Sequence, residues 1–179
     1  MLLFLPTIIL LIDIFVFSIY LICVLKTFGI PVNLSITYYS YERKRKGFGK
    51  IFPILLLFLC VTILPIWIRT TINNDFYGMI FSLFPCITIV CLFSVATTAR
   101  YKKRKYFIYF HYTCAIIAAI CAVVWIFIIA YEVVYVGIGI LLISLIIGLL
   151  TKTLKTCTLF WLEIAAFYAI LFTLLIILI

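Results

Sequence analysis

Six apolar stretches, each long enough to cross a lipid bilayer as a helix, fill most of this 179-residue chain. The hydrocarbon core of a bilayer is about 30 Å thick, so a spanning helix needs about 20 apolar residues. Six such helices use about 120 residues, which leaves enough only for chain ends and short connections. We therefore predict an all-α polytopic integral membrane protein, in which residues 1–179 form a single transmembrane domain of six helices. The predicted spans cover approximately residues 2–24, 51–68, 78–99, 107–130, 133–150 and 157–179.

Composition excludes several other classes of protein. Apolar and aromatic residues make up 69% of the chain and charged residues only 11%, whereas soluble domains carry about 25% charged residues. This balance excludes a water-soluble domain, a disordered chain and a fibrous one. The first apolar stretch lacks a basic leader and a small-residue cleavage site, so we expect a retained helix rather than a signal peptide.

The lysines and arginines predict the orientation in the membrane. All of them except Arg69 lie in the connections between spans one and two, three and four, and five and six. By the positive-inside rule these connections face the cytoplasm and both termini are non-cytoplasmic; we expect the bacterial inner membrane. Because the bases adjoin apolar spans, the net charge of +9 does not indicate a nucleic-acid partner. A five-span alternative, with Glu132 inside one bent segment, would place Lys152 and Lys155 on the opposite side.

Prolines and small residues predict details of individual helices. Pro65 should kink or end the second helix, and the polar segment 70–75 (TTINND) should form the turn that follows. Small residues mark close helix contacts in lipid, so we expect spans four, five and six to pack together. The bulky stretches 54–58 and 171–178 should face lipid. The small residues concerned are Cys114, Ala115, Ala118, Ala119, Ala122, Ser144, Gly148, Ala165 and Ala169.

Three ionisable residues, Asp13, His111 and Glu163, fall inside predicted spans. A charge at the bilayer centre costs at least about 2.5–3.5 kcal/mol, so such residues face the bundle interior and have a partner. His111 and Glu163 both lie about 6–9 Å from the cytoplasmic end, which permits a hydrogen bond between them. Asp13 lies nearer the midplane, where Ser18, Thr7 or a tyrosine could pair with it. Each of the three also has a purely structural interpretation, as a snorkelling side chain or as a hydrogen bond between helices.

The longest connection, residues 25–50, is basic and rich in tyrosine, and we predict a cytoplasmic loop. Such a segment suits phosphate-bearing lipid headgroups, at about 1 kcal/mol per base, so we expect anionic membrane lipids as partners. A second copy of the chain is a further candidate partner. The simpler explanation is that the bases set the topology and attract anionic lipid nonspecifically. The headgroup candidates are Ser35, Thr37, Tyr38, Tyr39, Arg43, Arg45, Arg100 and Lys103.

Cysteines and sequence motifs give no indication of a cofactor or a metal. The seven cysteines show neither C-x-x-C spacing nor a zinc-finger arrangement, so we interpret them as small packing residues. The sequence has no P-loop, no G-x-S-x-G and no H-E-x-x-H motif. A single histidine excludes the multi-histidine zinc sites of membrane hydrolases. We therefore expect no cofactor and no metal, and we lean against an enzyme without excluding one.

Three stretches carry a resemblance: Leu34 to Tyr39 (LSITYY), His111 to Ala115 (HYTCA) and Phe160 to Phe167 (FWLEIAAF). In these stretches the chain resembles a group of small, uncharacterised polytopic membrane proteins of bacteria and their phages. The group has no established activity, so the resemblance implies a membrane fold and no function. It does mark the hydroxyl-rich loop, His111 and Glu163, which the residue chemistry also marks.

Three functional hypotheses follow from the sequence. The leading one is transport or channel-like movement of a small solute, ion or lipid through a polar site made by Glu163 and His111, with Asp13 deeper. The second is a membrane enzyme acting on a lipid or lipid phosphate, with His111 as general base and Glu163 orienting it. The third is a nonenzymatic assembly or interaction subunit, whose polar residues hold helices together.

Overall fold

The computed structural model describes residues 4–74, 78–99 and 105–179, and every regular element among them is a helix. Six segments are long and apolar enough to cross a membrane, which confirms the predicted all-α fold of six spans. The short helical turn η4 (Tyr131–Val133) separates spans four and five, so the five-span alternative was wrong. The long helices are α1 (Phe4–Phe28), α3 (Ile51–Asn74), α5 (Leu83–Thr98), α6 (Lys105–Ile129), α7 (Val134–Leu150) and α8 (Leu154–Leu178).

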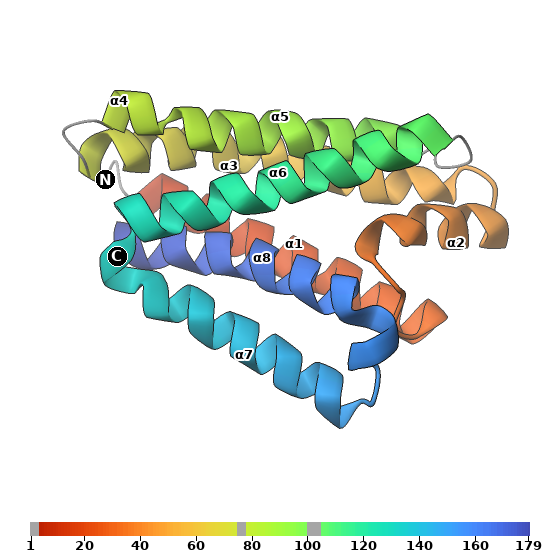
Figure 1. The fold of residues 1–179 in the computed structure, drawn as a ribbon. Coiled ribbons are helices and arrows are strands. Elements are labelled where there is room, and N and C mark those ends of the chain that lie inside the picture. Colours follow the sequence, from red (N-terminus) through yellow and green to blue (C-terminus); the bar gives the residue numbers. More distant parts are fainter. Residues whose placement is uncertain (1–3, 75–77, 100–104) are drawn as a thin grey trace.

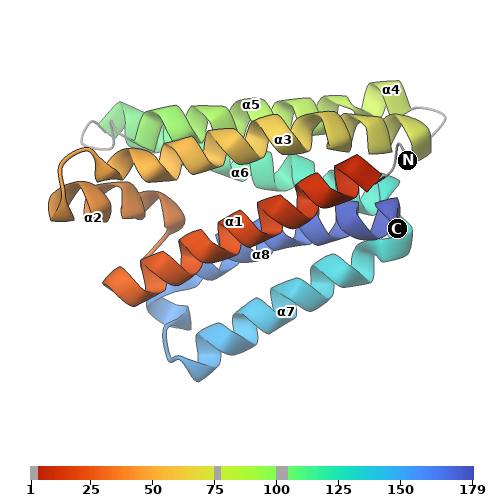
Figure 2. The same cartoon turned by 180° about the vertical axis from the view of Figure 1, so that it is seen from behind.

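The long helices form two layers (Figures 1 and 2). One layer holds α3, α5 and α6, and the other holds α1, α7 and α8. Both termini lie at one end of the bundle, as an even number of spans requires, and the short helix α2 (Thr37–Lys44) lies at the opposite end. That the end with the termini is non-cytoplasmic stays a prediction. Among the six spans α8 is the most buried and α7 the least.

Helix α3 continues through Pro65 to Asn74, so the prediction that the helix ends near Ile68 and turns at residues 70–75 was wrong. Two neighbouring threonines explain why polar residues did not end it. The hydroxyls of Thr70 and Thr71 donate to the carbonyls of Ile66 and Trp67, each at 2.8 Å. A threonine that bonds its own helix in this way is satisfied without water, and membrane helices tolerate proline because neighbours supply hydrogen bonds.

The packing of the last three spans differs from the expectation. Helix α6 packs mainly on α5, α7 packs on α8, and α6 and α7 meet only near their connection. The stretch 171–178 does not face lipid, because Leu171 and Leu174 are completely buried. The small residues act in two separate contacts instead of one: Ala118 and Ala122 are buried on α6, and Ser144 and Gly148 are buried on α7. The predicted contact between spans five and six is therefore confirmed, whereas span four packs mainly on α5 instead of on these two.

The predicted loop of residues 25–50 is largely helical. Helix α1 extends to Phe28, and the connection contains the turn η1 (Leu34–Ile36), helix α2 and the turn η2 (Phe48–Lys50). Asn33 begins η1, because its Oδ1 atom accepts hydrogen bonds from the Ile36 N–H and the Ser35 hydroxyl, both at 2.9 Å. Asparagine is a favoured residue at the start of a helix for this reason. Gly29 and Gly47 have positive φ angles of 71° and 91°, which fit the chain reversals after α1 and α2.

Gly148 allows the close contact between α7 and α8, and we predict that Gly148→Ala weakens it. A Cβ atom at this position would lie 2.9 Å from Cδ1 of Trp161, whereas a Cβ at Gly139 on the same helix meets nothing within 4 Å. Overpacking of this kind costs about 1–3 kcal/mol. In detergent, Gly148→Ala should lower the melting temperature relative to Gly139→Ala, which makes the same change in helix propensity without the clash. Equal melting temperatures for the two variants would contradict the contact.

Candidate functional site

Asp13 is completely buried in the middle of α1. Its Oδ1 atom accepts a 3.0 Å hydrogen bond from the Thr62 hydroxyl of α3, and its Oδ2 atom has no hydrogen-bond partner among the described residues. The sequence-based partners were therefore not the ones found: Ser18 bonds Tyr168 of α8 at 2.7 Å instead. A carboxyl oxygen buried without a partner is costly and rare in folded proteins. Asp13 is thus the most unusual polar group in the described bundle.

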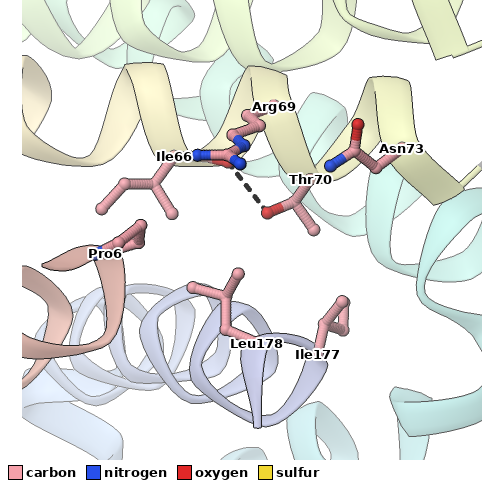
Figure 3. Close-up of a pocket in the computed structure, with 7 residues that line it drawn as sticks. All are labelled: Pro6, Ile66, Arg69, Thr70, Asn73, Ile177 and Leu178. Carbon is pink, nitrogen blue, oxygen red and sulfur yellow. Dashed lines mark hydrogen bonds between the residues drawn. The ribbon is translucent and has the colours of Figure 1, made fainter. Parts of the chain in front are cut away.

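A cavity of about 200 Å³ lies at the end of the bundle that holds the termini (Figure 3). Its walls come from α1, α3 and α8, the three helices around Asp13, and Figure 3 shows the Arg69 and Asn73 side chains at its α3 wall. The lining residues are Pro6, Ile66, Arg69, Thr70, Asn73, Ile177 and Leu178. The inward faces of these three helices, from this cavity to Asp13, are called the Asp13 seam below.

The cavity ends short of Asp13. Pro6 lies seven residues before Asp13 on α1, which is about 10 Å of helix rise. Leu10, one turn from each of them, is completely buried. The Asp13 seam is therefore open to the outside at one end and closed by Leu10 above the carboxyl group.

His111 is buried at 2% exposure on α6, and its Nδ1 atom lies 3.0 Å from the Thr98 hydroxyl of α5. Thr98 also donates to the Ser94 carbonyl at 2.6 Å. Because the single hydrogen of Thr98 is used there, its oxygen accepts the hydrogen bond from the imidazole, so Nδ1 carries the hydrogen. His111 therefore joins α6 to α5, a role that the sequence left open as the structural alternative.

Glu163 is half-buried on α8 and fixes the connection that follows α1. Its Oε2 atom accepts a 2.6 Å hydrogen bond from the backbone N–H of Leu34, the first residue of η1. A carboxylate that accepts from a backbone N–H forms a charge-assisted bond, which is among the stronger hydrogen bonds in proteins. The structure thus gives Glu163 and His111 different partners on different elements, rather than showing the direct pair that their depths permit.

A break in α8 extends the same contact. Cys157 has non-helical φ and ψ angles of −127° and 29°. The N–H of Phe160 donates to the carbonyl of Val32 at 3.2 Å, and the Cys157 thiol lies 3.6 Å from the Ile30 carbonyl. Residues 30–34 therefore bind the first turns of α8 through three polar contacts, of which the Glu163 carboxylate makes the innermost.

The hydroxyl residues of the connection face inward rather than toward headgroups. Thr37 is completely buried, donates to the Leu34 carbonyl at 2.5 Å, and lies 2.5 Å from the Tyr20 hydroxyl of α1. Because Thr37 has one hydrogen, Tyr20 is the donor in that second bond. Ser35 and Tyr38 are also buried, and Tyr39 is half-buried with its ring 5.2 Å from that of Tyr38. These four candidates form the inner wall of the connection.

The basic candidates behave differently. Arg43 and Arg45 are exposed at the end of α2, together with Lys44 and Lys46. The Arg45 guanidinium lies 4.8 Å from the centre of the Phe48 ring, which is itself 41% exposed. A basic surface with an exposed aromatic ring is suited to the boundary between lipid and water. Arg100 and Lys103 lie outside the described residues.

Glu42 stabilises the turn after α2. Its Oε2 atom accepts the N–H groups of Gly47 and Gly49 at 2.9 Å and 3.1 Å. These two backbone hydrogen bonds lower the pKa of the Glu42 carboxyl, with smaller contributions from Lys50 and Lys46. The single acid beside five bases was a usable signal in the sequence, but nothing there indicated its partners.

Two important residues of the bundle were missed from the sequence. Thr62 is the only hydroxyl residue between Ile51 and Ile68, and this isolation in an apolar run was a usable signal. Thr173 is completely buried on α8, and its hydroxyl has no hydrogen-bond partner among the described residues. Nothing in the local sequence distinguished Thr173 from a threonine that bonds its own helix.

Comparison with known proteins found no matching family model, no similar curated protein and no similar solved structure. The interpretation of this chain therefore depends on its own residues.

We predict that Glu163→Ala releases the turn at Leu34. Loss of a hydrogen bond to a charged group costs about 1.5–3 kcal/mol, so amide exchange at Leu34 should accelerate about tenfold or more. Glu163→Gln should give a smaller increase, because its amide oxygen still accepts. Hydrogen exchange of the detergent-solubilised protein measures this, with Glu132→Ala at the other end of the bundle as control. Unchanged exchange at Leu34 in Glu163→Ala would refute the contact.

We predict that the turn after α2 depends on ionised Glu42. A lowered pKa means that the ionised carboxyl stabilises the folded turn at neutral pH. That contribution is complete above the ordinary pKa of 4.5 and is lost as the pH falls through the lower, folded value. The amide proton shifts of Gly47 and Gly49 should titrate together below pH 4.5, and Glu42→Gln should abolish the titration. Titration at or above that pH would show that the two N–H groups do not hold the carboxylate.

Proposed function

We propose that this integral membrane protein moves a small ion along the Asp13 seam. The observation that carries the proposal is the completely buried Asp13 carboxyl group, with one oxygen bonded to Thr62 and the other without a partner in the described structure. Ionisable groups inside membrane spans commonly belong to ion or proton pathways. The cavity above Asp13 supports the proposal, because it brings water within about two helical turns of the carboxyl group.

The proposal moves the site away from the residues that the sequence favoured. His111 and Glu163 each have a local partner that accounts for their burial, on α5 and on η1 respectively. Movement along the Asp13 seam requires the Leu10 side chain to shift, because it is completely buried between the cavity and Asp13. Side-chain rotation and small helix shifts of this kind are ordinary gating motions.

The basic surface of α2 supports a second element of the proposal, contact with anionic lipid headgroups. Arg43, Lys44, Arg45 and Lys46 are exposed, and Phe48 is available beside them to enter the interface. Each base near an anionic surface contributes about 1 kcal/mol. We propose that this surface orients the protein with α2 in the cytoplasm of a bacterial cell, at the inner membrane.

The two alternative functions receive unequal support. A lipid-directed enzyme with His111 as general base needs an accessible imidazole, and this one is 2% exposed. An assembly subunit is supported by two observations. His111 and Glu163 each bond a neighbouring element, and α7 is packed on one side only, so that its outer face is apolar and exposed. That alternative leaves the unpartnered oxygen of Asp13 unexplained, and for this reason ion movement is preferred.

We predict that Asp13→Asn strongly slows ion movement. The protein is reconstituted into liposomes, with a sodium-sensitive or a pH-sensitive dye inside, and flux is started by a Na⁺ or a proton gradient. Wild type should dissipate at least one gradient, and Asp13→Asn should reduce that rate by about tenfold or more, because the amide carries no charge. Glu132→Gln, at an exposed residue that does not line the cavity, should match wild type. Absence of flux for both ions in wild type would overturn the proposal.

A further inference from the structure

Arg69 carries a positive charge at an end of the bundle that otherwise lacks one. Among the described residues it is the only lysine or arginine at the end that holds the termini, since the others lie at the end of the bundle that holds α2. Arg69 lines the cavity at this end, and none of the described residues that line it with Arg69 is acidic. Glu132 belongs to η4, between α6 and α7, and does not line it. The described walls of the cavity therefore supply a positive charge without a counter-ion.

The polar wall of the cavity is one face of α3. Ile66, Arg69, Thr70 and Asn73 line it together, and their spacing of three, one and three residues places them on a single face of a helix. Ile66 and Thr70 are buried, whereas Arg69 and Asn73 are exposed, with their side chains at the cavity in Figure 3. The hydrogen of the Thr70 hydroxyl is used by the Ile66 carbonyl. The guanidinium of Arg69 and the amide of Asn73 are therefore the hydrogen-bond donors at this wall.

The opposite side of the cavity is apolar. It is made by Pro6 of α1 and by Ile177 and Leu178 of α8, which Figure 3 shows across from the α3 wall. Pro6 is the third residue of α1, so the positive end of that helix dipole also lies at the cavity and favours an anion. Donors on one side and hydrocarbon on the other suit a molecule with an anionic group and an apolar part.

The cavity lies at the depth of the lipid headgroups. Helices α3 and α8 have 24 and 25 residues, which is about 36–38 Å of rise, whereas the hydrocarbon core is about 30 Å thick. Their last turns therefore extend about 3–4 Å beyond the core at each end. Asn73 and Leu178 belong to these last turns. Arg69 lies one turn before Asn73, and its long side chain can reach the phosphate layer.

We propose that this cavity binds the phosphate group of an anionic phospholipid from the leaflet on the side of the termini. The Arg69 guanidinium donates two parallel hydrogen bonds to the phosphate, a geometry for which arginine is suited, and the Asn73 amide donates another. The first acyl carbons lie against Pro6, Ile177 and Leu178. Free phosphate would leave this apolar side uncovered, which favours a lipid as the occupant.

This site is separate from the basic surface of α2, which lies at the opposite end of the bundle. The single uncompensated charge favours a headgroup with a net negative charge over a zwitterionic one. A bound anionic headgroup also offsets the charge of Arg69, which otherwise opposes the approach of a cation toward Asp13. Lipid binding itself does not depend on ion movement.

The test locates the lipid by photolabelling. Full-length protein in phosphatidylcholine nanodiscs receives a trace of phosphatidylglycerol that carries a diazirine near the ester end of one acyl chain, and labelled peptides are identified by mass spectrometry after irradiation. Wild type should be labelled at Ile177 and Leu178, and less by the matching phosphatidylcholine probe. Arg69→Gln should reduce this labelling about tenfold, because a charge-assisted hydrogen bond is lost. Arg45→Gln removes the same charge from the exposed end of α2 and should leave the labelling at α8 unchanged.

Equal labelling of Ile177 and Leu178 by the two probes would overturn the proposal, as would unchanged labelling in Arg69→Gln. Loss of the label when excess inorganic phosphate is added would show a site for the free anion and overturn the lipid as occupant. Should Arg69→Gln not fold, Arg69→Lys keeps the charge without the planar fork, and its labelling must fall between that of wild type and background. No outcome involves flux, so failure of this site leaves ion movement along the Asp13 seam standing.

Discussion

A polar group in the hydrocarbon core of a bilayer must find its partner inside the protein, since no water is present to replace one. The arrangement of this bundle follows from that requirement. Asp13 bonds Thr62 and so joins α1 to α3, and His111 bonds Thr98 and so joins α6 to α5. The Trp125 indole of α6 donates to Thr71 of α3 at 2.8 Å. Apolar packing alone does not favour one helix neighbour over another in lipid. These few hydrogen bonds supply the specificity.

The same requirement explains how the connection after α1 is held. The break at Cys157 leaves the Phe160 N–H outside the regular helical pattern, and the Val32 carbonyl accepts it. Glu163 then holds Leu34, and Thr37 and Tyr20 complete a buried chain of hydroxyls below it. A segment that reads as a solvated loop therefore folds largely against the bundle, while its basic end, from Arg43 to Lys46, is exposed. The first half of the connection is bound to the bundle, and the second half carries the exposed positive charge.

Asp13, Trp67 and Thr173 are exceptions to this general satisfaction, because each has a buried polar atom without a hydrogen-bond partner among the described residues. Elsewhere in the described structure, most of the buried polar side chains are bonded within the protein, as in native interiors generally. A buried carboxyl oxygen without a partner destabilises the fold, which makes a purely structural role a poor explanation for Asp13. Leu10, between Asp13 and Pro6 on α1, is completely buried, and the cavity lies at the Pro6 end.

The sequence alone determined that six helices exist, approximately where each lies, and that both termini share one end. Length and apolarity suffice for this, because a bilayer of fixed thickness accepts only helices of about 20 residues. It also identified Asp13, His111 and Glu163 as residues that need partners. The partners themselves were decided only by the tertiary structure, since Thr62, Thr98 and the Leu34 N–H are distant in the chain or belong to the backbone. The end of α1 at Phe28, the end of α3 at Asn74 and the burial of α8 depend likewise on contacts between helices. Periodicity within one helix carries no information about which neighbour it will meet.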